Sequence, residues 1–157
     1  KVDLNLTLEI VQNNLKAMLA NSGGSIFKPV SLPIIAANRT QITQLFQNLI
    51  SNGLKFRNGK APEINITYEE TPSSYIFSIK DNGIGIPAEL QGKIFAVFQR
   101  LHRKTEYDGT GVGLAICKKV VQNHGGQIWV ESKPGEGSIF YFSIEKVSLN
   151  EGILVPV

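Results

Sequence analysis

The chain has 157 residues, 42% of them hydrophobic, which is enough for one domain with a buried core and too few for two. Its 16 Lys and Arg and 13 Asp and Glu residues give a net charge of +3 without long runs of one sign, so no nucleic-acid partner is expected. The single cysteine, Cys117, excludes an internal disulfide framework, and no apolar run is long enough to cross a bilayer, so no direct membrane contact is expected.

The first third of the chain predicts two helices and two short strands. Apolar side chains recur at helical spacing over residues 5–21 and stop before a Ser-Gly-Gly sequence, which is typical of a helix end. Short apolar stretches at 25–28 and 33–37, set apart by prolines, predict strands. Residues 40–56 carry one apolar face and are followed by Arg-Asn-Gly, which predicts the second helix.

The middle of the chain predicts a hairpin followed by loops. Residues 63–69 and 75–80 alternate apolar and polar side chains around a Thr-Pro-Ser-Ser turn. A glycine-rich turn at 81–87 comes next, and a short apolar helix is expected at 94–98. The polar stretch 99–108 shows no regular pattern.

The last third predicts a helix and two more strands. The helix is expected at 112–124, ending at Gly-Gly, and the strands at 127–132 and 138–145 flank a Lys-Pro-Gly-Glu-Gly turn. This mixed order predicts an α+β fold, a two-layer sandwich of one mostly antiparallel sheet covered by helices. We expect one domain over residues 1–147 and a C-terminal tail at 148–157.

A polar stripe on the second helix is the first candidate for chemistry. Gln44, Asn48, Asn52 and Lys55 follow one another at intervals of four, four and three residues, which places them on one side of a helix. Neutral amide oxygens beside a lysine suit a hard cation and the phosphates that it carries. The same stripe is also typical of the polar edge of an ordinary amphipathic helix.

The second candidate is the turn that begins at Asp81. Its carboxylate precedes Gly83 and Gly85, which let a ligand approach the backbone, and Ile86 completes the turn. A carboxylate accepts a hydrogen bond from the exocyclic amine of adenine, whereas guanine places an oxygen there. An ordinary Asp-Asn or Asn-Gly turn explains the residues equally well.

The third candidate is the sequence Gly-Thr-Gly-Val-Gly-Leu at 109–114, which opens a predicted helix. Free N–H groups and the helix dipole at such a start hold phosphates. The Gly-x-Gly-x-Gly spacing, preceded by polar residues, argues against a dinucleotide-binding fold. The sequence also lacks a P-loop and the His-Arg-Asp and Asp-Phe-Gly motifs of protein kinases.

Three further residue groups have simpler readings. The stretch 100–104, Arg-Leu-His-Arg-Lys, suits phosphates or a solvated loop. Cys117 lies among aliphatic residues and is read as a core cysteine. Neither His102 nor His124 stands in the His-Glu/Asp-x-x-x-Pro setting of a phosphoacceptor, so both are read as structural or ligand-adjacent.

Together these motifs resemble, in order and spacing, the boxes of histidine kinase catalytic domains. The resemblance covers about residues 2–145 and rests on five segments: Asn48-Leu-Ile-Ser-Asn52-Gly-Leu-Lys55-Phe56 (N box), Asp81-Asn-Gly-Ile-Gly (G1), Phe95-Ala-Val-Phe98 (F), Gly109-Thr-Gly-Val-Gly-Leu (G2) and Gly135-Glu-Gly-Ser138-Ile-Phe140. The segments 98–103, 107–111 and 128–132 are similar to those of phytochrome-like sensor kinases.

The resemblance implies the Bergerat ATP-binding fold, with ATP and Mg²⁺ as ligands and a role for each matching residue. It implies that Asn52 coordinates Mg²⁺ and that Asn48 and Lys55, the expected catalytic residues, lie at the phosphates. It implies that Asp81 recognises adenine, with Ser138 as a water-mediated helper. Asparagine at position 48, where related ATPases carry glutamate, implies slow intrinsic hydrolysis.

The remaining site residues also follow from the resemblance. Gly83, Gly85 and Ile86 are expected to shape the pocket, and residues 88–108 to form a lid over ATP. The residues expected to face the phosphates, mainly through backbone amides, are Gly109, Thr110, Gly111, Val112, Gly113 and Leu114, joined by Arg100 from the lid. Gly53 departs from the family, because many members carry alanine there, and glycine inside a helix costs about 1 kcal/mol.

The resemblance implies partners outside this chain. The phosphoacceptor histidine is expected in an upstream dimerisation domain of the same protein, and a response regulator is expected to receive the phosphate. Because the chain starts Lys-Val-Asp, we expect it to be part of a longer protein, monomeric as a fragment and cytoplasmic. A stand-alone ATPase or serine kinase of the same fold, and an interaction module that binds no nucleotide, are the alternatives.

Overall fold

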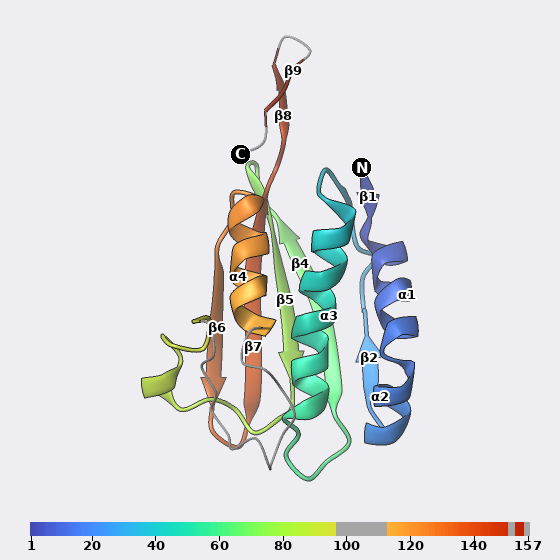
Figure 1. Ribbon diagram of the computed structural model, residues 1–157, viewed down its shortest axis with the longest axis vertical. Coiled ribbons are helices and arrows are strands. Elements are labelled where there is room, and N and C mark those ends of the chain that lie inside the picture. The colour runs from blue at the N-terminus through green and yellow to red at the C-terminus, as the bar shows by residue number, and fades with distance from the viewer. Residues whose placement is uncertain (97–112, 151–152, 156–157) are drawn as a thin grey trace.

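A computed structural model describes residues 1–96, 113–150 and 153–155, with side chains described up to residue 147. Its main feature is a five-stranded sheet in the order β2-β4-β5-β7-β6 (Figure 1). The first pair is parallel and the other three pairs are antiparallel, which confirms the predicted mixed, mostly antiparallel sheet. The strands are β2 (Ser25–Phe27), β4 (Glu63–Glu70), β5 (Ser74–Asp81), β6 (Ile128–Lys133) and β7 (Gly137–Glu145).

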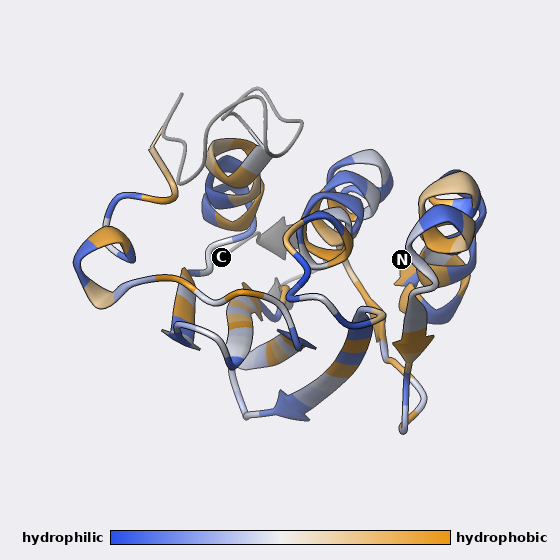
Figure 2. Ribbon diagram, turned by 90° about the horizontal axis from the view of Figure 1, so that it is seen from below, coloured by the Kyte–Doolittle hydropathy of each residue, from blue (hydrophilic) through white to orange (hydrophobic). Residues whose placement is uncertain are grey.

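Four α-helices lie on one face of this sheet. They are α1 (Leu4–Asn14), α2 (Lys16–Ser22), α3 (Arg39–Lys55) and α4 (Gly113–Asn123). Figure 2 shows the helices in a row on one side of the strands, with α3 and α4 over the sheet and α1 beyond α3. Asn38 begins α3 by accepting the Gln41 N–H at 3.0 Å, as expected of an asparagine N-cap. The two-layer α+β sandwich is therefore confirmed.

The core lies between the sheet and α3, because the apolar face of α3 meets the inward side chains of β4, β5 and β7. The Phe46 ring lies edge-on to Phe77 and Phe142, at centroid distances of 5.9 and 5.4 Å. Phe77 and Phe142 stack on each other at 5.0 Å. Such pairs add about 0.5–1.5 kcal/mol beyond the burial of their area. This packing fixes α3 relative to the ends of β5 and β7, where the candidate site lies.

One predicted helix, over residues 5–21, is in fact two helices. The chain bends at Leu15, where φ is −99° and ψ is 12°, between α1 and α2. Leu15 is buried, and its N–H still donates to the Val11 carbonyl, so the helix is bent there and not unravelled. The bend lets Met18 and Leu19 continue packing against the core. As predicted, α2 stops at a left-handed glycine, Gly23, with φ of 70°.

The short helix predicted at 94–98 does not form in its described part. Residues 91–95 make turns that follow a 3₁₀ turn, η1 (Ala88–Leu90), and Phe98 lies outside the described residues. The Lys93 and Ala96 N–H groups donate three residues back, to Leu90 and Lys93. Ile94 is buried, so this apolar segment anchors a loop to the core.

Four short strands lie outside the main sheet. β1 (Val2–Asp3) pairs with β3 (Ile34–Ile35), so the strand predicted at 33–37 joins the start of the chain instead of the main sheet. In the predicted tail, β8 (Ser148–Asn150) and β9 (Ile153–Val155) form an antiparallel pair that continues beyond β7 (Figure 1). Within the described ranges, no helix has both the length and the apolar character that a membrane span requires.

Candidate functional site

The site is built around a row of side chains that crosses three strands. The register places Asp81 of β5 opposite Ser138 of β7, and Ser138 opposite Ser132 of β6. Residues opposite one another in a sheet share a face, so the three side chains lie together on the helix-covered side. All three line one cavity at this end of the sheet, together with Gln91 and with residues of the opposite face such as Lys80 and Glu131.

Asp81 is held in place by backbone donors. Its Oδ1 accepts the Gly83 N–H at 2.9 Å and the Ser138 N–H at 3.2 Å. Burial raises the pKa of Asp81, and these two hydrogen bonds oppose that shift. Its second oxygen, Oδ2, faces the glycine at position 53 of α3, where a Cβ would lie 3.6 Å away. The carboxylate thus presents one oxygen that no described residue hydrogen-bonds.

Ser132 is a member of the site that motif reading missed. Its Oγ accepts the Ile86 N–H at 2.7 Å and lies 2.9 Å from the Gly137 carbonyl and 2.7 Å from Ser138 Oγ. A signal for it existed, because the turn between the last two strands fixes a register that brings Ser132 opposite Ser138.

Gln91 is the second residue that the motifs do not reveal. Its Nε2 donates to the Ile86 carbonyl at 2.9 Å and to the Ser132 carbonyl at 3.0 Å. Phe95 lies edge-on to Phe140 at 6.2 Å. The beginning of the predicted lid therefore packs against the sheet and is hydrogen-bonded to it. Residues 97–108 of that lid lie outside the described residues.

The two glycines of the G1 segment are required by close backbone packing. A Cβ on Gly83 would lie 2.3 Å from the Phe56 carbonyl oxygen, and one on Gly85 would lie 2.1 Å from that of Lys133. Gly85 also has a φ of 76°, which favours glycine. Ile86 is buried, and its N–H already donates to Ser132. The segment is thus wedged between the end of α3 and the β6–β7 turn.

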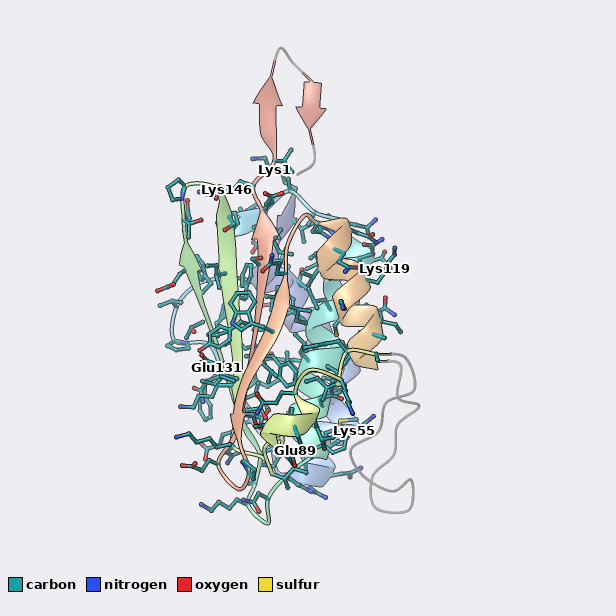
Figure 3. The ribbon with its side chains drawn as sticks, turned by 90° about the vertical axis from the view of Figure 1, so that its left-hand side faces the viewer. Lys1, Lys55, Glu89, Lys119, Glu131 and Lys146 are labelled. Carbon is teal, nitrogen blue, oxygen red and sulfur yellow. The ribbon has the colours of Figure 1, made fainter. Side chains whose placement is uncertain are left out.

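The polar stripe of α3 ends at the same end of the molecule as β5 (Figure 1). Asn48 reaches across to α4, where its Nδ2 lies 3.4 Å from the Gly113 carbonyl. The half-buried Asn52 side chain makes no hydrogen bond with any described residue. Lys55 lies toward one end of the molecule, and Lys1 and Lys146 lie toward the other end (Figure 3). The stripe is therefore more than a solvated helix edge, since Asn48 already joins two helices.

These residues fit a magnesium ion that arrives with a nucleotide. An unpartnered amide oxygen on Asn52 is a suitable ligand, and Mg²⁺ in nucleotide sites takes few protein ligands beside phosphates and water. Among the described residues, no group of three or more His, Cys, Asp and Glu side chains forms a metal cage.

The phosphate-facing residues are only partly described. Gly113 is the first residue of α4, and a Cβ there would meet no atom of the described residues within 4 Å, while Leu114 packs against the core. The other expected phosphate contacts lie outside the described residues: Arg100, Gly109, Thr110, Gly111 and Val112.

His124 and Cys117 both have structural surroundings. His124 Nδ1 lies 2.8 Å from the Val120 carbonyl, so it carries the proton, and Nε2 accepts the Asn38 N–H at 3.1 Å. The histidine thereby joins the end of α4 to the start of α3. Burial raises the pKa of the Cys117 thiol to about 12. His102 lies outside the described residues.

Comparison with known proteins agrees with this geometry. Residues 37–148 match the family described as histidine kinase-, DNA gyrase B-, and HSP90-like ATPase. The phytochrome-like protein Cph1 of Synechocystis sp. is 51% identical over 131 residues, which are 83% of this chain and 17% of that protein. The chain therefore spans less than a fifth of this relative's length, and the predicted likeness to phytochrome-like kinases is confirmed.

Solved structures give the same answer. The catalytic domain of the histidine kinase ThkA superimposes with a TM-score of 0.75 at 31% identity, covering 92% of this chain and 93% of that one. ShkA, solved at full length in complex with AMPPNP, gives 0.79 at 26% identity, covering 99% of this chain and 32% of that one. ThkA has also been solved in complex with the response regulator protein TrrA. The chain therefore belongs to the histidine kinase-, DNA gyrase B- and HSP90-like ATPase family, as a catalytic domain of the histidine kinase type.

Proposed function

We propose that this domain binds Mg-ATP and transfers the γ-phosphate to a histidine in an upstream dimerisation domain of the same protein. A response regulator then receives the phosphate. The catalytic domain proper comprises residues 1–147, with 148–157 as a tail, and works in the cytoplasm, where ATP is supplied.

The observation that carries this proposal is how the two carboxylate oxygens of Asp81 are hydrogen-bonded. One carboxylate oxygen accepts from two backbone N–H groups, no described residue hydrogen-bonds the other, and Asp81 lines a cavity at the ends of β5, β6 and β7. A fixed acceptor of this kind suits the amino group of adenine, which donates, and repels the O6 of guanine, which accepts.

The α3 stripe supplies the phosphate end of the proposed site. Asn52 would hold Mg²⁺, which neutralises phosphate charge when bound, and Lys55 adds a positive charge at the end of the helix. Asn48 lies beside the start of α4, through its 3.4 Å contact with Gly113. Asparagine is a poor general base, so water attack is not promoted and ATP is kept for the histidine.

The glycine-rich segment completes the proposed site. The start of α4 at Gly113 offers free N–H groups and the positive end of the helix dipole to phosphates. Residues 109–112, which precede α4 in the sequence, and Leu114 would contribute backbone amides to the phosphates, and Arg100 would add a cation. Gly83, Gly85 and Ile86 form the wall beneath adenine.

Two similar proteins of known structure support ATP and a response regulator as partners. ShkA binds AMPPNP, a nucleotide analogue, and ThkA forms a complex with its response regulator. Both proteins extend well beyond the part that this chain matches, since the chain covers 32% and 40% of their chains. An acceptor domain and a regulator are therefore proposed for the whole protein.

Calorimetric titration with ATP and GTP in the presence of Mg²⁺ tests the nucleotide site. We expect ATP to bind and GTP not to, and we expect Asp81→Asn and Asn52→Ala to weaken ATP binding by about tenfold or more. Asn14→Ala, on the exposed side of α1, is the matched control and should leave the affinity unchanged.

Transfer is tested separately by adding an acceptor domain from the full protein and measuring phosphohistidine. We expect label on the acceptor and none on the chain alone. Steady ATP hydrolysis by the chain, or phosphoserine on a partner, would favour a stand-alone ATPase or serine kinase instead. A wild-type chain with no affinity for either nucleotide would leave an interaction module as the better description.

A further inference from the structure

Ser132 sits at the centre of a hydrogen-bond network that connects three parts of the site. Its Oγ has three neighbours at hydrogen-bond distance: the Ile86 N–H, the Gly137 carbonyl and the Ser138 hydroxyl. Gly137 and Ser138 line the same cavity as Asp81, and Ile86 belongs to the G1 segment that follows Asp81.

The proton positions in this network follow from counting donors and acceptors. A serine hydroxyl has one proton to donate and two lone pairs to accept with. The Ile86 N–H can only donate and the Gly137 carbonyl can only accept. If Ser132 gives its proton to Gly137, then the 2.7 Å contact with Ser138 needs a proton from Ser138. This arrangement satisfies all three contacts.

The opposite arrangement makes one bond fewer. If Ser132 donated to Ser138, its partly buried hydrogen bond with the Gly137 carbonyl would be lost. The first arrangement therefore dominates. In it, the Ser138 proton points toward Ser132, and only lone pairs of Ser138 Oγ remain for the cavity.

We infer that Ser132 is a positioning residue for base recognition, because it makes the Ser138 hydroxyl an obligatory acceptor toward the nucleotide. This inference rests on the proposed ATP site. The proposed adenine site then has two acceptors, Asp81 Oδ2 and Ser138 Oγ, for the substituent at C6 of the purine. The amino group of adenine, or a water between it and Ser138, can donate to both, whereas an oxygen at C6 can donate to neither.

Removing Ser132 should change specificity and not only affinity. In Ser132→Ala the Ser138 hydroxyl loses its acceptor, and its proton is free to turn toward the cavity and donate to an oxygen at C6. ITP is the matched probe, since inosine carries that oxygen without the second amino group of guanine. We expect the preference for ATP over ITP to fall by about tenfold, the value of one hydrogen bond.

The test is a double-mutant cycle read as the ratio of the ITP and ATP dissociation constants, measured by calorimetry with Mg²⁺. Ser132→Ala should lower the ratio in the wild-type background and leave it within about twofold in a Ser138→Ala background, because the effect passes through Ser138. Ser132→Thr retains the hydroxyl and should keep the wild-type ratio.

A purely structural role for Ser132 predicts something different. In that case Ser132→Ala weakens ATP and ITP by the same factor, or lowers the ratio equally with and without Ser138, and either result overturns the inference. If circular dichroism shows that Ser132→Ala does not fold, Ser132→Cys, a weak acceptor of similar size, is judged by the same two criteria.

Failure of the inference can be told apart from failure of the function. A wild-type chain that binds no ATP refutes both the proposed site and the role of Ser132. A wild-type chain that prefers ATP, with a ratio that Ser132→Ala does not change, refutes the role of Ser132 alone.

Discussion

Asp81 and Ser138 are 57 residues apart in the chain, and the Ser138 N–H donates to Asp81 Oδ1 at 3.2 Å. The two residues are opposite partners on β5 and β7, so the sheet itself aligns the carboxylate. A carboxylate fixed by backbone donors stays in place without a ligand. The adenine side of the proposed site is thus preorganised, as recognition requires.

This arrangement predicts a pH effect on stability. Folding raises the pKa of Asp81 above its ordinary value of 3.8, mainly through burial. The stability that Asp81 contributes is therefore fully present below pH 3.8 and is lost as pH rises through the raised pKa. Asparagine cannot ionise, so Asp81→Asn should gain stability relative to the wild type across that interval, while binding ATP more weakly. Urea denaturation from about pH 3 to 7 measures the unfolding free energy of both proteins. If the advantage of Asp81→Asn over the wild type shrank as the pH rose, this account would be contradicted.

Gly85 and Gly135 offer a matched pair for testing the wedge formed by the G1 segment. Their φ values are similar, 76° and 81°, so alanine is strained at both. A Cβ at 85 would also lie 2.1 Å from the Lys133 carbonyl oxygen, whereas one at 135 would meet no described residue within 4 Å. We expect Gly135→Ala to lower the free energy of unfolding by about 1 kcal/mol and Gly85→Ala by at least about 2 kcal/mol more. Equal losses by chemical denaturation would rule out the steric explanation.

Gly53 should be coupled to Ile64. Alanine at 53 gains about 1 kcal/mol of helix propensity, but its Cβ would lie 2.4 Å from Ile64 Cδ1. Ile64→Val removes that methyl group. The contact with Asp81 Cβ, at 3.2 Å, remains in both backgrounds, so we expect Gly53→Ala to be more favourable by about 1 kcal/mol in the Ile64→Val background than in the wild type. The measurement is a denaturation cycle of four proteins, and the idea fails if Gly53→Ala has the same effect in both.

His124 is expected to matter for stability and not for phosphate transfer. His124→Ala removes the acceptor of the Asn38 N–H at the start of α3. Because Asn38 is exposed, water replaces part of this bond, and the loss of unfolding free energy should be about 0.5–1.5 kcal/mol. ATP affinity and label transfer to an added acceptor should stay at the wild-type level. Loss of transfer in a folded His124→Ala variant would show a chemical role.

Cys117 should react only when the domain opens. Its side chain is fully buried, and burial raises its pKa to about 12, so the reactive thiolate is scarce at neutral pH. We expect a disulfide reagent to label the native chain slowly and the urea-unfolded chain at once. Saturating Mg-ATP should slow the native reaction further, because it stabilises the folded state. Fast labelling of the native chain would mean that α4 opens locally.

Local patterns were enough to predict most of the elements. The apolar face of α3 and the alternation in β4 and β5 depend on residues close together in the chain, and the structure has each element within a residue of its predicted bounds. The family motifs likewise identified Asp81 and Asn52 as candidates.

What only the tertiary structure decided is which distant residues meet. Sheet order places β7 between β5 and β6, so Ser132 and Ser138 join Asp81 in one row. The bend at Leu15 and the fastening of Gln91 to β6 also depend on packing against neighbours far along the chain. Periodicity indicates which face of an element is buried. Strand register and the donor and acceptor roles of the serines depend on partners that meet only when the sheet forms.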